Sequence, residues 1–174
     1  MIILGIDPGS RCTGYGLIDN QPGRIKYLHS GFFKIQGENL AQRLGKIYQH
    51  IDELIRQYQP QQMGIEKVFM HRNADSALKL GQARGVAICA GHLAGLEIAE
   101  YAPREIKQAI VGSGAASKEQ VQHMVKHLLG LRGSLQVDES DGLAIAICHA
   151  QYYATQQKTG LDITLLKRRR SVRR

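Results

Sequence analysis

Hydrophobic and polar positions along this chain of 174 residues follow two different periods, and their order predicts a class of fold. Three stretches near the N-terminus have the continuous or alternating apolar pattern of β-strands, at residues 2–7, 12–19 and 24–35. The segments between them, "PGSR" and "NQPG", are typical of turns. Because these connections are short, the three strands are predicted to form an antiparallel meander.

The pattern then changes to a helical period. Apolar side chains recur three or four positions apart within residues 38–58, so they share one face of a predicted helix that Pro60 ends. The residues on this face are Leu40, Leu44, Ile47, Ile51, Leu54 and Ile55. One apolar face is typical of a helix that packs against a sheet.

Strands and helices alternate through the rest of the chain. Strands are predicted at residues 62–70 and 97–102. Helices are predicted at residues 73–96 (with Asn73 as N-cap), 103–111, 117–130 and 139–157. This order predicts an α/β fold, in which a mixed five-stranded sheet of the antiparallel meander and parallel strands is flanked by helices. Residues 1–156 are expected to form a single domain.

The charge distribution indicates a class of partner. The net charge is +8, but residues 167–174 hold six basic residues and no acid, so the rest of the chain carries only +2. Residues 157–174 are expected to be a disordered basic tail. Such a tail suits a polyanion such as DNA or RNA, although a tail that only improves solubility has the same composition.

Cysteine content and hydropathy bear on the cellular location. Cys12, Cys89 and Cys148 are odd in number and far apart, which favours buried thiols in a reducing compartment over disulfides or a zinc site. No apolar run approaches the roughly 20 residues of a membrane span. We therefore expect a cytoplasmic protein with no membrane partner.

Two carboxylates occupy unusual positions at the ends of apolar strands. Asp7 follows the apolar run at residues 2–6, and Glu66 follows "MGI". An aspartate before Pro8 and Gly9 can also be a turn residue that binds backbone N–H groups, and this explanation remains open for Asp7 alone. Two such acids on neighbouring strands instead indicate a shared cation.

A second pair of acids lies at the start of the last predicted helix. Asp138 and Asp141 are three positions apart and share a face, which borders the apolar side that must face the sheet. Acids in a first helical turn also stabilise the helix dipole, so this explanation remains open too. The two aspartates are expected to look toward the end of the sheet that carries Asp7 and Glu66.

Convergence of these four acids would create a metal site. Clustered carboxylates repel one another, and their oxygen ligands favour Mg²⁺ or Mn²⁺ over Zn²⁺. Four of them can hold two ions about 3.5–4 Å apart, which is the arrangement of two-metal phosphodiester cleavage. His123 and His127 are four positions apart on a helix, but they have no obvious third ligand.

Three long motifs cover much of the chain: "GIDPGSRCTGYG", "IEKVFMHRNADSALKLGQARGVAI" and "DESDGLAIAICHA". They resemble the RuvC family of bacterial Holliday junction resolvases, and the similarity extends from residue 2 to about residue 153. The resemblance implies a ribonuclease H-like fold and a homodimer that cuts four-way junction DNA by paired symmetric nicks, in recombination and repair. It also implies the branch-migration proteins RuvA and RuvB as partners.

The resemblance also implies roles for individual residues. The positions of the family's four catalytic, metal-binding acids are occupied here by Asp7, Glu66, Asp138 and Asp141. Two Mg²⁺ ions per subunit are implied, for which Mn²⁺ could substitute, and hydrolysis would leave 5′-phosphate and 3′-hydroxyl ends. Glu139 should point elsewhere because of helical geometry.

Four further residues correspond to DNA contacts of the family. Phe69 would stack on a base near the strand exchange point, and Arg72 would bind a phosphate. Lys107 and Lys118 would lie beside the scissile phosphate. Without the family, Phe69 would be taken for a core side chain and the lysines for ordinary exposed positions. The small residues of the helix at 73–96 are implied to pair with the same helix of a second subunit.

Three other function classes fit parts of the sequence. An ATPase of the actin or sugar-kinase type also begins with a strand, an acid and a glycine-rich turn, but it needs two such domains. A DNA-architecture protein could share the basic tail, but it has no use for four converging acids. A single-domain nuclease of the same fold that acts on RNA is the nearest rival, and the "VFMHRN" loop and the dimer helix argue against it.

Overall fold

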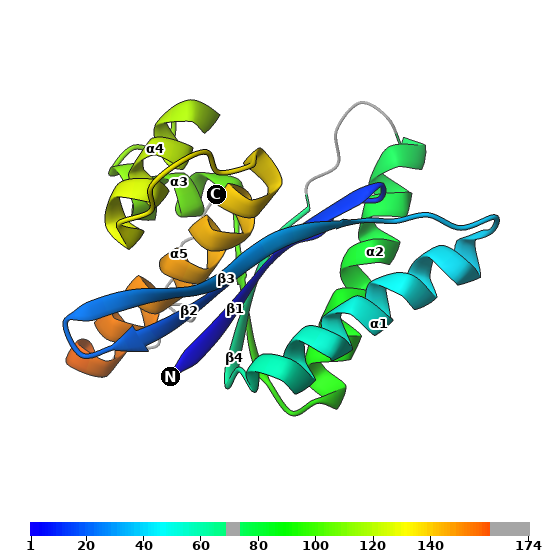
Figure 1. Ribbon diagram of the computed structural model, residues 1–174, viewed down its shortest axis with the longest axis horizontal. Helices are drawn as coiled ribbons and strands as arrows, with labels where there is room; N and C mark the ends of the chain where they lie inside the picture. Colours follow the sequence, from blue (N-terminus) through cyan, green and yellow to red (C-terminus); the bar gives the residue numbers. More distant parts are fainter. Residues whose placement is uncertain (69–73, 161–174) are drawn as a thin grey trace, which may run out of the picture.

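The computed structural model describes residues 1–68 and 74–160, which are built on a mixed five-stranded sheet (Figure 1). The strands are β1 (Ile2–Asp7), β2 (Cys12–Gln21), β3 (Arg24–Lys34), β4 (Gln62–Glu66) and β5 (Glu97–Tyr101), and their order across the sheet is β3-β2-β1-β4-β5. β1, β2 and β3 pair antiparallel, whereas β4 is parallel to both β1 and β5. The predicted meander and mixed sheet are confirmed.

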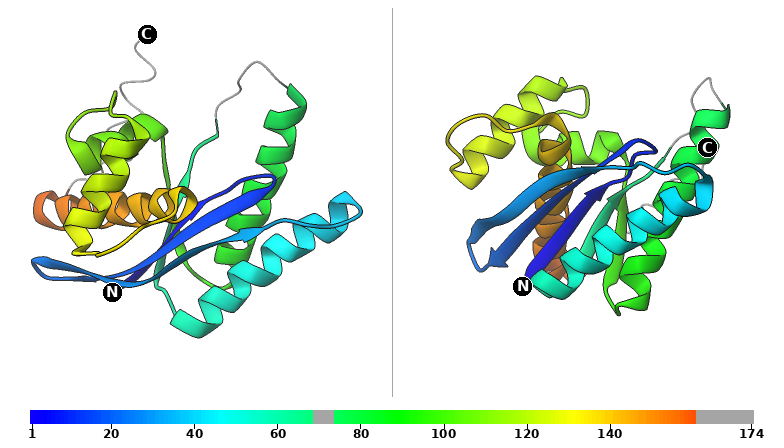
Figure 2. Two further views of the ribbon diagram at one scale, coloured as in Figure 1. Left: turned by 45° about the horizontal axis from the view of Figure 1, so that its top comes forward. Right: turned by 45° about the vertical axis from the view of Figure 1, so that its right-hand side comes forward.

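Helices cover both faces of the sheet. They are α1 (Leu40–Tyr58), α2 (Ala74–Leu93), α3 (Pro103–Val111), α4 (Lys118–Leu129) and α5 (Val137–Thr159). Figure 2 shows α1 and α2 on one face and α5, backed by α3 and α4, on the other. Each face has its own core: Ile47 and Ile51 of α1 pack in the first, and Leu143 and Ile145 of α5 pack in the second.

Local signals in the sequence account for several helix ends. The Asn39 side chain accepts a hydrogen bond from the backbone N–H of Gln42 at the start of α1, and Ser117 and Gln120 form a capping box at the start of α4. The α1 helix ends at Tyr58, before Pro60, as predicted. The proposed N-cap at residue 73 lies outside the described residues.

Two expectations about these elements are wrong. Leu40 was expected on the apolar face that packs against the sheet, but it is the first residue of α1 and is 48% exposed. The strand expected at residues 62–70 ends at Glu66, which is also where its pairing with β5 ends at Tyr101. The strand end therefore leaves Glu66 at the rim of the sheet.

Glycines let α5 approach the sheet unusually closely. A Cβ on Gly142 of α5 would collide with the backbone of Tyr15 on β2. A Cβ on Gly5 of β1 would collide with the carbonyl of Gly142, and one on Gly14 of β2 with the carbonyl of Asp138. The first two turns of α5 therefore lie against the ends of β1 and β2.

The cysteines are less buried than predicted. Cys148 is buried in the α5 core, but Cys12 is half-buried and Cys89 is exposed on α2, so the expectation of three buried thiols is wrong for these two. Cys12 is the first residue of β2, and Cys89 lies on α2 away from the buried positions Ala87 and Ala90. In residues 1–68 and 74–160, no helix has the length and apolar character needed to cross a membrane.

Candidate active site

Three of the four candidate acids line one pocket. β1 and β4 run parallel, and their last paired residues, Ile6 and Ile65, are followed by Asp7 on β1 and Glu66 on β4. Both carboxylates line a cavity of about 240 Å³ together with Asp141 from the first turns of α5. Acids that are distant in the sequence therefore meet where β1, β4 and α5 come together.

Asp138 borders this pocket on its β2 side. Its Oδ2 accepts a hydrogen bond from the Sγ of Cys12 at 3.4 Å, and it is not among the residues that line the cavity. Its negative charge nevertheless contributes to raising the pKa of Asp141. The fourth acid therefore lies outside the cavity, in contact with β2, and affects Asp141 inside the cavity through its charge.

Burial and mutual repulsion dominate the electrostatics of the pocket. Burial and the charge of Glu66 raise the pKa of Asp7 from 3.8 to about 8, and the two carboxyl groups share a hydrogen bond. Burial also raises the pKa of Glu66 and of Asp141. Without a cation, Asp7 is therefore protonated at neutral pH and its proton is shared with Glu66.

Two lysines bring positive charge to the same cavity. Lys118 opens α4, and its Nζ donates a hydrogen bond to Asp141 Oδ2 at 3.4 Å. The charge of Asp141 raises the pKa of Lys118, so this ammonium group stays charged. Lys107 from α3 lines the cavity beside it. Both lysines that the resemblance implicates thus lie next to the acids.

The donor set suits a hard divalent cation. Carboxylate oxygens are the ligands that Mg²⁺ and Mn²⁺ prefer, and a cation would remove the repulsion that holds a proton on Asp7. Within the described residues, no three histidine, cysteine, aspartate or glutamate side chains are close enough to hold an ion by themselves. His123 and His127 therefore have no third ligand of this kind among these residues. Mg²⁺ needs fewer, because it commonly binds one or two carboxylates and completes its shell with water and substrate phosphate. The pocket therefore fits the ion.

Two contacts that support the site were not predicted. Arg84 of α2 donates from Nε to the carbonyl oxygen of Glu66 at 3.0 Å and pairs with Glu100 of β5, which anchors the end of β4. Cys12 holds Asp138, as described above. Side chains two positions apart in a strand share a face, so Cys12 lies on the same face of β2 as Gly14. Because Gly14 pairs with Asp7, the position of Cys12 near the site could have been predicted. Nothing in the sequence indicates the Arg84 contact.

The remaining candidates lie elsewhere. Glu139 accepts a hydrogen bond from the backbone N–H of Gln136 at 3.2 Å, so it caps α5 and does not line the pocket, as expected. Phe69 and Arg72, for which DNA contacts were predicted, fall outside the described residues.

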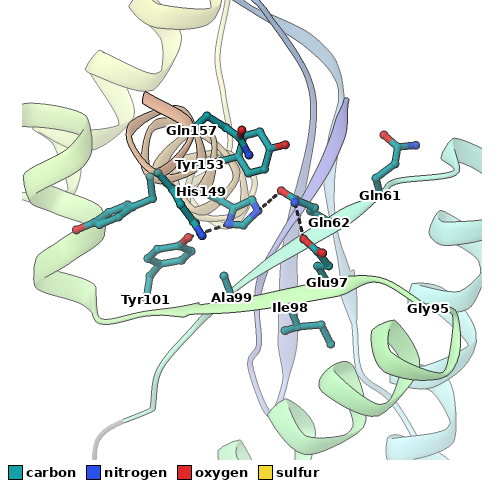
Figure 3. Close-up of a pocket in the computed structure, with 12 residues that line it drawn as sticks. Gln61, Gln62, Gly95, Glu97, Ile98, Ala99, Tyr101, His149, Tyr153 and Gln157 are labelled. Carbon is teal, nitrogen blue, oxygen red and sulfur yellow. Dashed lines mark hydrogen bonds between the residues drawn. The ribbon is translucent and has the colours of Figure 1, made fainter. Parts of the chain in front are cut away.

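A larger cavity of about 650 Å³ lies at the opposite end of β4 (Figure 3). A chain of hydrogen bonds crosses it: Tyr101 donates to Nδ1 of His149, Nε2 of His149 donates to Gln62, and Gln62 donates to Glu97. Burial lowers the pKa of His149 to about 4, so this ring is neutral. One carboxylate lines this cavity and neither lysine nor arginine does, so it lacks the charges of a metal or phosphate site.

Comparison with known proteins identifies the family. The family model described as "Crossover junction endodeoxyribonuclease RuvC" matches residues 3–149. The chain belongs to the RuvC family. A RuvC of Tolumonas auensis is 58% identical over 156 residues, which cover 90% of this chain and 88% of that protein. The RuvC family is a family of metal-dependent nucleases.

Solved RuvC structures have the same fold. The structure of Thermus thermophilus RuvC matches with a TM-score of 0.80 and 32% identity, covering 89% of this chain and 96% of that one. The same protein in complex with a Holliday junction substrate matches with a TM-score of 0.80, 30% identity and the same coverage. The expected ribonuclease H-like fold is thereby confirmed.

Proposed function

We propose that this chain is a structure-specific endonuclease that resolves four-way DNA junctions by paired symmetric nicks, in recombination and repair. The observation that carries the proposal is the pocket lined by Asp7, Glu66 and Asp141 in a chain of the RuvC family. Support for the substrate comes from T. thermophilus RuvC, whose structure is described as a complex with a Holliday junction substrate.

The four acids are proposed as the ligands of Mg²⁺, with two ions per subunit and with Mn²⁺ able to substitute. Asp7, Glu66 and Asp141 would bind from within the cavity, and Asp138 from its β2 side. Bound ions would supply a water nucleophile at neutral pH and stabilise the departing oxygen. The raised pKa of Asp7 supports this assignment, because a bound cation would offset the repulsion between the clustered carboxylates.

The chain's own residues position and neutralise the reacting phosphate. Attack of water on phosphorus breaks the bond to the 3′ oxygen and leaves a 3′-hydroxyl and a 5′-phosphate. The Nζ of Lys118, next to Asp141, and the side chain of Lys107 offset the charge that develops on the phosphate. Arg84 fixes the end of β4, and Cys12 orients Asp138, so these two are positioning residues.

The proposal includes contacts that the described residues do not contain. Phe69 would stack on a base at the centre of the junction, and Arg72 would bind a phosphate. RuvA and RuvB remain the expected partners. The three free cysteines fit the reducing conditions of the cytoplasm, where we expect the protein to act.

A homodimer is proposed because two symmetric nicks need two related sites. The α2 helix supports this arrangement, since Leu78 is 63% exposed and Leu93 is 73% exposed. Gly81 and Gly85 lie on the same helix, and the space beside each of them is open, so another backbone could approach them closely.

The function is tested by incubating the protein with a synthetic four-way junction and with a linear duplex of the same sequence. With Mg²⁺, we expect two symmetric nicks in the junction that ligase can reseal, and intact duplex. With EDTA, neither substrate should be cut. Equal cutting of junction and duplex, or nicks in EDTA, would contradict the proposal. An RNA–DNA hybrid serves as the third substrate and tests the rival ribonuclease activity.

A further inference from the structure

The strand register places an exposed aromatic side chain in line with the acids. On the face covered by α5, Tyr101 of β5 is level with Glu66, and Asp7 is level with Gly14 of β2. Gly14 is in turn paired with Phe32 of β3. One row across the sheet therefore runs from β5 through the two acids to Phe32.

Phe32 lies on the far side of Asp138 from the cavity. Phe33 is buried in the core under α1, so Phe32, the next residue along the strand, points to the α5 face. The backbone of Asp138 packs on Gly14, which separates Asp7 from Phe32 in the row. The Phe32 side chain is 39% exposed. Phe32 thus flanks the acid group on the side away from Lys107 and Lys118.

A basic residue follows Phe32 at the rim of the site. Lys34 is exposed and is paired with Cys12, whose thiol contacts Asp138. β3 runs in the same direction as β1, so Lys34 lies beyond the row, on the side where β1 ends in Asp7. Phe32 and Lys34 therefore form an aromatic and basic pair at the mouth of the site.

We propose that Phe32 and Lys34 bind the scissile DNA strand on the Asp138 side of the site. This inference rests on the proposed function. The ring of Phe32 packs on an unstacked base or on a deoxyribose, and the ammonium group of Lys34 binds a phosphate. A single exposed apolar side chain needs no explanation by itself. Phe32 differs because it lies in the row of the acids with a lysine beside it.

The spacing sets where the contact falls along the DNA. Neighbouring strands lie about 4.8 Å apart, so the Phe32 backbone is about 10 Å from that of Asp7, two strands away. This equals the axial length of about three nucleotides of a duplex strand. Lys107 and Lys118 would then hold the strand on one side of the nick and Phe32 and Lys34 on the other.

A direct test uses the absence of tryptophan from the chain. A Phe32→Trp variant carries one fluorophore at the proposed contact, and Tyr48→Trp carries one on α1, where Tyr48 is 38% exposed. Labelled junction is titrated in EDTA, and its anisotropy reports binding independently. We expect the emission of Phe32→Trp to be quenched with the same midpoint as the anisotropy change, and the emission of Tyr48→Trp to stay constant.

Junction affinity of substituted proteins provides the second readout. Phe32→Ala should weaken junction binding about fivefold, at the lower end for aromatic–base stacking, and Lys34→Gln should weaken it through loss of a phosphate contact. Tyr48→Ala should bind and cut normally. Normal junction binding with constant Phe32→Trp emission would overturn the inference and leave the proposed function intact. If the wild-type protein neither binds nor cuts junctions, the proposed function fails, and the inference fails with it.

Discussion

At the scale of single residues, Asp7 combines a functional position with a thermodynamic cost. Its carboxyl group is half-buried at the end of β1, where burial and the charge of Glu66 raise its pKa. A buried carboxylate next to another acid destabilises the metal-free fold, because ionisation must occur against both burial and repulsion. The same repulsion between carboxylates favours the binding of a cation.

The pH dependence of unfolding should reveal this cost. Folded Asp7 keeps its proton up to about pH 8, whereas an unfolded aspartate loses it near 3.8. Between these values the folded state binds more protons, so in EDTA the free energy of unfolding should fall as the pH rises. At pH 8, Asp7→Asn should raise the free energy of unfolding by at least about 1 kcal/mol, measured by urea denaturation.

The window from pH 6.5 to about 8 lies above the range in which His149 titrates. Burial lowers the pKa of His149 from 6.5 to about 4, so its effect on stability has the opposite sign to that of Asp7. Between pH 6.5 and about 4, the free energy of unfolding falls as the pH falls, because the unfolded state binds more protons. Saturating Mg²⁺ should remove most of the difference between wild type and Asp7→Asn. Equal slopes for the two proteins between pH 6.5 and 8 in EDTA would show that Asp7 is already ionised.

At the scale of elements, the sequence predicts the strands and helices but not how closely they approach. The capping box of α4 and the apolar runs of β1 and β4 depend on local preferences, so they could be located in advance. The position of α5 depends on glycines of three elements, among them Gly5 and Gly142, and no single segment contains that information. The Asp138 side chain likewise lies outside the cavity, in contact with Cys12, which its position in the sequence does not indicate.

The candidate site was predictable to the same extent. Acids at the ends of buried strands stand out because they conflict with their apolar surroundings, and this conflict marks Asp7 and Glu66. Lys118 gives no such signal, since an exposed lysine at the start of a helix is ordinary. Only the family resemblance indicated it, and the structure then places its Nζ 3.4 Å from Asp141.

Gly142→Ala tests the close approach of α5. The added methyl group would collide with the backbone of Tyr15, so α5 must shift away from the sheet. We expect the free energy of unfolding to fall by at least about 2 kcal/mol. The cleavage rate should also fall under conditions where the variant is fully folded, because Asp141 moves with the helix. Gly45→Ala, inside α1 with open space around it, should stabilise the protein by up to about 1 kcal/mol. Normal stability and cleavage of Gly142→Ala would contradict the role of the close approach.

At the scale of the whole molecule, one active site must be paired with another to make two symmetric nicks. One chain presents one acid pocket among its described residues. The second pocket would come from a second subunit joined along α2, the helix whose Arg84 also anchors the end of β4. Subunit contact and the position of Glu66 would therefore involve the same helix.

Sedimentation should give a mass of twice 19.3 kDa. Gly85→Arg places a long charged side chain on the proposed contact face of α2 and should yield monomers that make single, uncoordinated nicks. Gly45→Arg makes the same change on α1, also in open space, and should leave both the mass and paired cutting unchanged. A wild-type protein that sediments as a monomer while making paired nicks would rule out this arrangement.

The most direct measurement compares cleavage and binding of a four-way junction by wild type, Asp7→Asn and the control Asp52→Asn, in which the changed acid lies on α1. We predict that Asp7→Asn binds the junction with an affinity close to that of wild type but cuts at least 1,000-fold more slowly, about 4 kcal/mol in the barrier. Asp52→Asn should bind and cut like wild type. Cutting by Asp7→Asn at the wild-type rate in Mg²⁺ would contradict the assignment of the carboxylate pocket as the catalytic metal centre.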